Sequence, residues 1–185
     1  STAIGAMARS WGNNSLAIGS QAGAYGEKST ALGDTNTVGF DMTNATLSGA
    51  SAGALGKGNK VYGNNAYAIG SANTVGTATV TEITEANGDK IKKVTAGTVK
   101  GNTAGAFGYK NTITTDNSYA VGSNSTISGD NGMALGTSAS VTANNGLALG
   151  NNTKVANDNA VAIGNGSETA AAVATSSETN HGANH

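Results

Sequence analysis

The segment NSYAVGSNSTISGDNGMALG, residues 117–136, contains the unit on which the chain is built. It holds two copies of the tripeptide Ala-apolar-Gly, which close at Gly122 and Gly136, one 14-residue period apart. The tripeptide occurs ten times in the chain, closing at Gly5, Gly19, Gly33, Gly56, Gly70, Gly108, Gly122, Gly136, Gly150 and Gly164. Seven of the nine intervals equal this 14-residue period, and the other two exceed it by insertions of 9 and 24. Such a fixed period predicts a solenoid.

Each repeat combines two short apolar segments with two turns. The residue before the closing glycine is large and apolar, and a second apolar position follows five residues after the glycine, as at Ile113 and Ile127. The Asn, Asp and Gly residues between them tolerate left-handed backbone angles, whereas the β-branched residues favour strands. A helix is excluded, because glycine about every seventh residue would cost about 1 kcal/mol each time. One repeat therefore forms one coil, and equivalent strands of successive coils pair in parallel about 4.8 Å apart.

Strand alternation places the large residue before each glycine and the invariant alanine on opposite faces. We expect the large apolar row to lie inside the coil and the alanine row to lie where a neighbouring backbone comes close, and the alternation alone also allows the reverse assignment. The structural repeat residues are Ala17, Ile18, Gly19, Ala68, Ile69, Gly70, Ala120, Val121, Gly122, Ala134, Leu135, Gly136, Ala148, Leu149, Gly150, Ala162, Ile163 and Gly164.

The composition excludes several classes of function. Charged residues are 11% of the chain and the net charge is −1, so no basic cluster predicts nucleic-acid binding. Cysteine is absent, which excludes disulfides and thiolate metal sites. No nucleophile, base and orienting group can be assembled from the two histidines and the scattered carboxylates. The sequence therefore predicts no catalytic residue, no metal and no cofactor.

A thin coil of this kind favours association. Apolar burial contributes about 25 cal/mol per Å², whereas ordering each residue costs about 1.5 kcal/mol, so a single thin chain would be marginally stable. Association with identical chains would cover exposed surface, and such rods usually close with cyclic symmetry. This argument predicts an oligomer without giving the number of chains.

The hexapeptides NSLAIG (14–19), NSYAVG (117–122) and NAVAIG (159–164) resemble the head repeats of trimeric autotransporter adhesins, the YadA-like family. The resemblance covers residues 1–168 apart from the insertions. It implies an all-β fold, a left-handed parallel β-roll with three chains side by side as a homotrimer. It also implies non-catalytic attachment to host extracellular matrix proteins, to cell-surface receptors or to other bacteria. The location implied is the bacterial cell surface, projecting from the outer membrane through a stalk and an anchor outside this chain. Residues 169–185 would be a tail or the start of a neck.

Two insertions, at about 40–49 and about 77–101, each follow the sequence NTVG and should emerge from the same side of the rod. Gly53 and Gly105, where the repeat resumes, replace a larger residue, and we expect this to let the insertions fold back closely. The longer insertion predicts a β-hairpin with its turn at Asn87-Gly88. This insertion forms a charged arm on a rod that has few other charged residues, and loops on rigid scaffolds commonly carry binding. We therefore predict that the arm binds the ligand, through Glu82, Glu85, Lys90, Lys92 and Lys93. Alternatively, the arm packs on an adjacent subunit or only solvates the surface.

Other functions remain as alternatives. The head could be a structural spacer or an autoagglutination module. An ice- or surface-binding solenoid would need a flat, regular threonine array, and we expect that threonine does not recur at one repeat position. A hexapeptide-repeat acyltransferase would advance by sixes and supply a catalytic histidine at a subunit boundary, and the sequence has neither feature.

Overall fold

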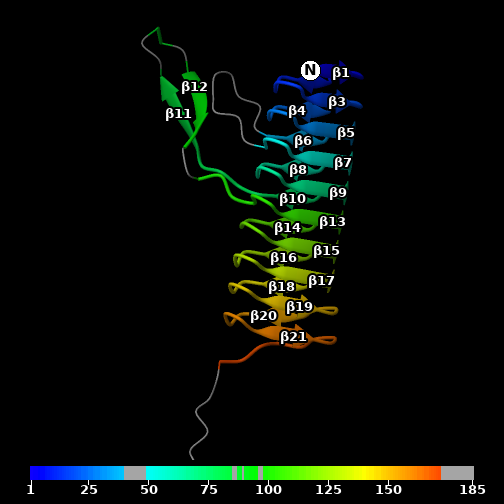
Figure 1. Cartoon of the computed structure of the whole chain (residues 1–185), viewed down its shortest axis with the longest axis vertical. Helices are drawn as coiled ribbons and strands as arrows, with labels where there is room; N and C mark the ends of the chain where they lie inside the picture. The colour runs from blue at the N-terminus through cyan, green and yellow to red at the C-terminus, as the bar shows by residue number, and fades with distance from the viewer. Residues whose placement is uncertain (40–48, 85–86, 89, 96–97, 172–185) are drawn as a thin grey trace, which may run out of the picture.

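The computed structural model describes residues 1–39, 49–84, 87–88, 90–95 and 98–171 of the 185. These residues form an all-β rod in which the chain coils around one long axis (Figure 1). The coil makes about ten turns, and strands of successive turns pair in parallel at the 14-residue spacing. The predicted solenoid of 14-residue repeats is confirmed. The handedness of the coil stays a prediction.

Each turn contributes one strand to each of two sheets that extend along the rod. The ten-stranded sheet contains, in spatial order, β1 (Thr2–Ile4), β3 (Leu16–Ile18), β5 (Thr30–Asp34), β7 (Gly53–Lys57), β9 (Tyr67–Ser71), β13 (Gly105–Tyr109), β15 (Tyr119–Ser123), β17 (Met133–Thr137), β19 (Leu147–Leu149) and β21 (Val161–Ile163). The nine-stranded sheet contains β2 (Arg9–Ser10), β4 (Gly23–Ala24), β6 (Thr37–Val38), β8 (Lys60–Val61), β10 (Thr74–Val75), β14 (Thr112–Ile113), β16 (Thr126–Ile127), β18 (Ser140–Val141) and β20 (Lys154–Val155).

The register of the repeats continues through both insertions. Strands β15 and β17 align Ala120 with Ala134, one repeat later. Strands β9 and β13 align Ala68 with Ala106 in the same way, although the longer insertion separates them in the sequence. Strands β5 and β7, on either side of the shorter insertion, also pair directly. The insertions are therefore additions to the rod and do not alter its repeat.

The interior between the two sheets is lined by small and medium-sized side chains. The invariant alanines of the ten-stranded sheet point inward, and these nine are at most 4% exposed: Ala17, Ala31, Ala54, Ala68, Ala106, Ala120, Ala134, Ala148 and Ala162. Opposite them, the apolar row of the nine-stranded sheet is at most 1% exposed, with Val38, Val61, Val75, Ile113, Ile127, Val141 and Val155. The two rows together form one narrow apolar core.

The expectation that the large apolar row lies inside is therefore wrong. Ile69 is 43% exposed, Phe107 37% and Ile163 63%. Each 14-residue turn must supply two strands and two corners, so the two sheets lie close together. The Val and Ile side chains of one sheet fill most of the gap at the packing density of a protein interior, which leaves space for only a methyl group opposite. The large side chains must point outward.

The closing glycine of each repeat is required by backbone crowding. Gly122 has φ +132°, and a Cβ added there would collide with the carbonyl oxygen of Gly136 in the next turn. A side chain cannot fit where successive backbones stack so closely. At the corners, by contrast, residues with φ near +55°, such as Asn117 and Asn124, have room for side chains. This difference explains why the first position is always glycine, whereas the corners accept several residue types, asparagine most often.

A ladder of buried asparagines connects the middle turns. Asn36, Asn59, Asn73 and Asn111 are each 0% exposed. The Nδ2 of Asn73 donates to the carbonyl oxygen of Gly108 at 2.8 Å, and its Oδ1 accepts from the backbone N–H of Asn111 at 3.0 Å. These bonds satisfy backbone groups that the corner would otherwise bury without partners. They also couple each turn to the next.

Replacing the closing glycine should destabilise the rod strongly. We expect Gly122→Ala to lower the free energy of unfolding by more than about 2 kcal/mol, because the new methyl group meets backbone that cannot move aside. Gly58→Ala is the matched control: its φ is +64°, the nearest atom to an added Cβ is 3.8 Å away, and Ala72 already holds the equivalent corner at φ 58°. Urea unfolding followed by circular dichroism measures both. Equal stability of the two variants would contradict this account of the glycines.

Candidate interaction surfaces

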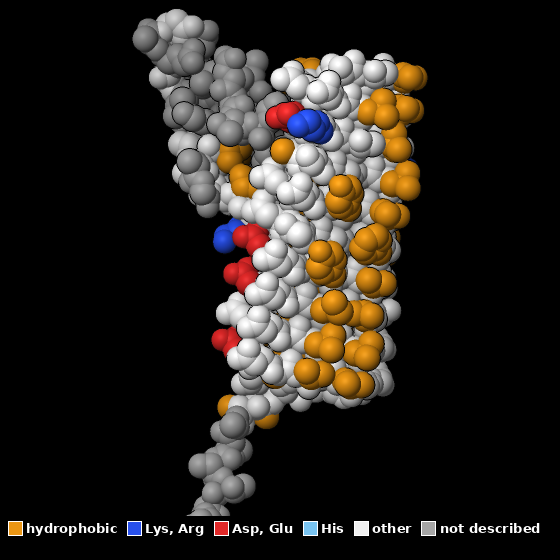
Figure 2. All heavy atoms as spheres, viewed as in Figure 1, with side chains coloured by type: hydrophobic (Ala, Val, Ile, Leu, Met, Phe, Trp, Pro, Cys, Tyr) orange, Lys and Arg blue, Asp and Glu red, His pale blue; other side chains and the backbone are white. Residues whose placement is uncertain are grey.

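The outer face of the ten-stranded sheet carries an apolar strip along the rod. Figure 2 shows hydrophobic side chains gathered in columns down the length of the molecule. One column precedes the closing glycines, with Ile4, Ile18, Leu32, Leu55, Ile69, Phe107, Val121, Leu135, Leu149 and Ile163. The other stands two residues earlier, with Leu16, Tyr67, Tyr119, Met133, Leu147 and Val161. We call these two columns the apolar strip.

The apolar strip is large for a surface exposed to water. Ten strands about 4.8 Å apart extend about 43 Å, and two columns about 7 Å apart with their side chains cover on the order of 500 Å². Among its members, Leu55 is 50% exposed, Val121 44% and Val161 56%. Contiguous apolar patches of this size on soluble proteins usually mark an interaction site. The strip is therefore the leading candidate for a contact surface, and the sequence pattern did not reveal it, because the same residues were expected inside.

Gly53 and Gly105 lie within the apolar strip, and the structure gives them a role different from the one expected. A Cβ added to Gly53 would lie 3.1 Å from Cδ1 of Tyr67, and one added to Gly105 would lie 3.1 Å from Cδ1 of Tyr119. Each glycine thus makes room for the ring of a tyrosine one turn later. The Tyr67 hydroxyl donates to the carbonyl oxygen of Ser51 at 3.1 Å. The expectation that these glycines let the insertions fold back is replaced by this ring packing.

The charged arm consists of β11 (Val80–Thr84) and β12 (Lys90–Val94), which pair antiparallel and extend away from the rod (Figure 1). The register places Glu82 opposite Lys92, Thr81 opposite Lys93 and Thr84 opposite Lys90. The arm therefore brings four of the five predicted ligand-binding residues onto two adjacent strands. Glu85, the fifth, lies outside the described residues. The same is true of the shorter insertion's residues 40–48.

The root of the arm is closed by a pair of glycines. Gly76 and Gly101 have φ +92° and +82°, and a Cβ added to Gly101 would meet the backbone of Gly76. The backbone N–H of Lys100 donates to the carbonyl oxygen of Thr77 at 2.8 Å. The Lys100 ammonium lies 3.6 Å from Oδ2 of Asp116, a partly exposed ion pair that contributes little stability. The chain thus leaves and re-enters the rod at one point.

Hydroxyl side chains recur on the outer face of the nine-stranded sheet. Thr37, Thr74, Thr112, Thr126 and Ser140 occupy one position of the repeat, so the expectation that threonine does not recur at one position is wrong. Lys60 separates the first two, however, and Lys154 follows the last. The row is consequently not the unbroken threonine array that ice binding requires.

The described part of the chain shows no constellation for metal chemistry. Within it, no three His, Cys, Asp or Glu side chains are close enough together to hold a metal ion. No helix among the described residues is long and apolar enough to cross a membrane. The surfaces considered for interaction are therefore the apolar strip and the charged arm.

A pair of neighbouring substitutions tests which side of the strand faces the core. We expect Ala120→Leu to lower the free energy of unfolding by about 2 kcal/mol or more, because Ala120 is 0% exposed in a full interior. Val121→Leu should change it by less than about 0.5 kcal/mol, because Val121 is 44% exposed. Chemical denaturation of both variants, at a protein concentration low enough to keep the chains monomeric, provides the comparison. A larger loss for Val121→Leu would reverse the assignment of the two faces.

Comparison with known families agrees with the geometry. The model of the YadA head domain repeat, which spans two copies, matches residues 1–22, 12–36, 116–139, 128–153 and 142–167. A search of curated proteins found no significant match. The matched segments lie on either side of the two insertions, where the 14-residue spacing is uninterrupted. Over these residues the chain carries YadA-like head repeats, which characterise the head domains of trimeric autotransporter adhesins.

Proposed function

We propose that this chain is the non-catalytic head of a bacterial cell-surface adhesin and that three copies pack side by side through the apolar strip. The single observation that carries the assembly is the strip itself: large apolar side chains, most of them 37–63% exposed, run the length of the rod. The number three comes from the family. Cyclic symmetry suits a rod with one apolar face, because three such faces can all turn toward a common axis.

The energetics of the strip favour association. Burying on the order of 500 Å² per chain at about 25 cal/mol per Å² contributes about 12 kcal/mol per chain. Association costs about 4–15 kcal/mol in lost translational and rotational freedom. The gain of three chains together exceeds the cost of bringing them together, so a stable trimer is expected. The nine-stranded sheet and the arm remain available on the outside.

A charge placed in the apolar strip should dissociate the trimer. We expect the wild-type protein to sediment at three times the chain mass of 17.9 kDa. Leu135→Lys should shift it to monomer, because three ammonium groups would be buried near one axis. Thr126→Lys is the control and should stay trimeric, because lysine already occupies this position of the repeat at Lys60 and Lys154. Sedimentation equilibrium decides the outcome, and a Leu135→Lys protein that stays trimeric would contradict the proposed interface.

The charged arm is the element that we assign to ligand binding. It carries opposite charges on paired strands, with Glu82 opposite Lys92, and it joins the rod where Gly76 and Gly101 lie against each other. Three arms on one trimer would present the same weak site three times, so that effective concentration raises the avidity. Host extracellular matrix proteins, cell-surface receptors and other bacteria are the ligand classes that suit an adhesin head. The alternatives, a spacer or an autoagglutination module, would not need the arm for host attachment.

Removing the arm tests this assignment without disturbing the rod. Joining Gly76 directly to Gly101, with residues 77–100 deleted, restores the 14-residue interval between Gly70 and Gly108. We expect an unchanged trimer and at least a tenfold loss of binding to the matrix protein or cell type that the wild type binds best on an array.

The shorter insertion provides the matched control. Joining Gly39 to Gly49, with residues 40–48 deleted, restores the 14-residue interval between Gly33 and Gly56. This variant should retain binding. Full binding by the protein that lacks the arm would remove the arm from ligand recognition and favour the spacer function.

A further inference from the structure

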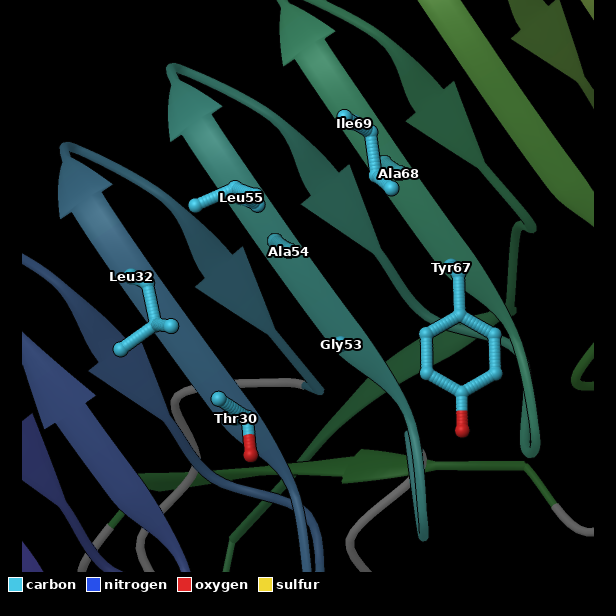
Figure 3. A pocket seen from close by; sticks show the side chains of 8 residues that line it. All are labelled: Thr30, Leu32, Gly53, Ala54, Leu55, Tyr67, Ala68 and Ile69. Carbon is cyan, nitrogen blue, oxygen red and sulfur yellow. The ribbon is translucent and has the colours of Figure 1, made fainter.

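The apolar strip contains a hollow of about 300 Å³ centred on Gly53. Figure 3 shows its lining, which comes from the three neighbouring strands β5, β7 and β9. Leu32, Leu55, Tyr67 and Ile69 surround the hollow, and the missing side chain of Gly53 forms its floor. Because the hollow opens on the face proposed to contact other copies, the trimer must either fill it or enclose an empty space.

The space beside Gly53 is partly open, whereas the space beside Gly105, the other glycine of the same column, is filled by side chains of the same chain. At Gly105, an added Cβ would meet two rings of the same chain, with Cδ1 of Tyr119 at 3.1 Å and Cε2 of Phe107 at 3.2 Å. At Gly53, the ring of Tyr67 approaches from one side, with Cδ1 at 3.1 Å and Cε1 at 3.2 Å, and the nearest atom outside this ring is the carbonyl oxygen of Thr30 at 3.7 Å. The leucine that shares the turn, Leu55, leaves space beside it. A side chain from outside the chain can therefore enter.

The symmetry of a trimer indicates which side chain that is. Around a three-fold axis parallel to the rods, each turn meets the same turn of its neighbours. In each copy, the strands of the ten-stranded sheet run roughly perpendicular to this axis, and in all three copies they run around it in the same sense. The residue before the closing glycine in one copy therefore faces the residue two positions earlier in the next copy. In the fourth turn these residues are Leu55 and Gly53.

We propose that Leu55 of each copy inserts into the Gly53 hollow of the next and fixes the axial register of the three rods. The inference rests on the proposed trimer. A slip of one turn would bring Leu55 against the ring of Tyr67. In the fourth turn, the correct register thus pairs a large side chain with a small one, and this slip pairs two large ones.

The same substitution at two places in one column tests the proposal. Leu55→Phe should leave the concentration at which the trimer dissociates within about threefold of wild type, because the hollow has room for the added atoms. Leu149→Phe should raise that concentration at least about tenfold, because Leu149 shares its turn with Leu147 and would therefore face a leucine side chain of the next copy. Analytical ultracentrifugation over a dilution series measures both variants. If the wild type is trimeric and the two substitutions raise the dissociation concentration equally, the proposed insertion of Leu55 into the Gly53 hollow is wrong. If the wild type is monomeric, the proposed trimer is wrong.

A second measurement locates the contact in the assembled protein. Tyr67 is replaced by p-azidophenylalanine, a photo-crosslinker close to tyrosine in size, and chains with and without the crosslinker are mixed before irradiation. Mass spectrometry should then find adducts between copies at Leu55. Adducts between copies that occur only at turns distant from the fourth, or no adduct between copies in a trimeric sample, overturn the proposal.

Discussion

The narrow space between the two sheets of one coil is the constraint on which the rest of the structure depends. A 14-residue turn can enclose the Val or Ile row of the nine-stranded sheet and, opposite it, only alanine. Every larger apolar side chain of the ten-stranded sheet is therefore excluded from the core. A fold that cannot bury its own large residues must cover them with something else, and this requirement connects the repeat to the proposed assembly.

Backbone crowding along the axis fixes one position of each repeat as glycine, whereas the corner positions can vary. Gly122 has no space for a Cβ above Gly136, so one position per turn is fixed as glycine. The chain leaves the rod after Gly76 and returns at Gly101, where the two backbones lie close together, without changing the pairing of β9 and β13. The rod is thus a rigid scaffold, and its individual features are carried by insertions. This division agrees with the proposal that the arm, and not the rod, binds the ligand.

Much of the fold could be predicted from the sequence, because the residues that determine it recur at a fixed spacing. The 14-residue recurrence from Gly122 to Gly136 predicts the coil, and the corner asparagines predict the turns. Alternation along a strand separates Ala120 from Val121 but does not tell which faces inward, since that depends on how closely the second sheet approaches. The roles of Gly53 and Gly105 were missed for a similar reason. The tyrosine that covers each glycine comes from the next turn, and only the stacked structure brings the two together.

The most direct test of this account is thiol labelling of two adjacent positions, since the chain has no cysteine of its own. Leu149→Cys should react with a maleimide rapidly in dilute solution and at least tenfold more slowly once the copies associate, because its side chain lies on the strip. Ala148→Cys should be protected at every concentration, since Ala148 is 0% exposed. Rapid labelling at position 148, or labelling at position 149 that does not change with concentration, would contradict the claim that the narrow core forces the large side chains outward into an interface.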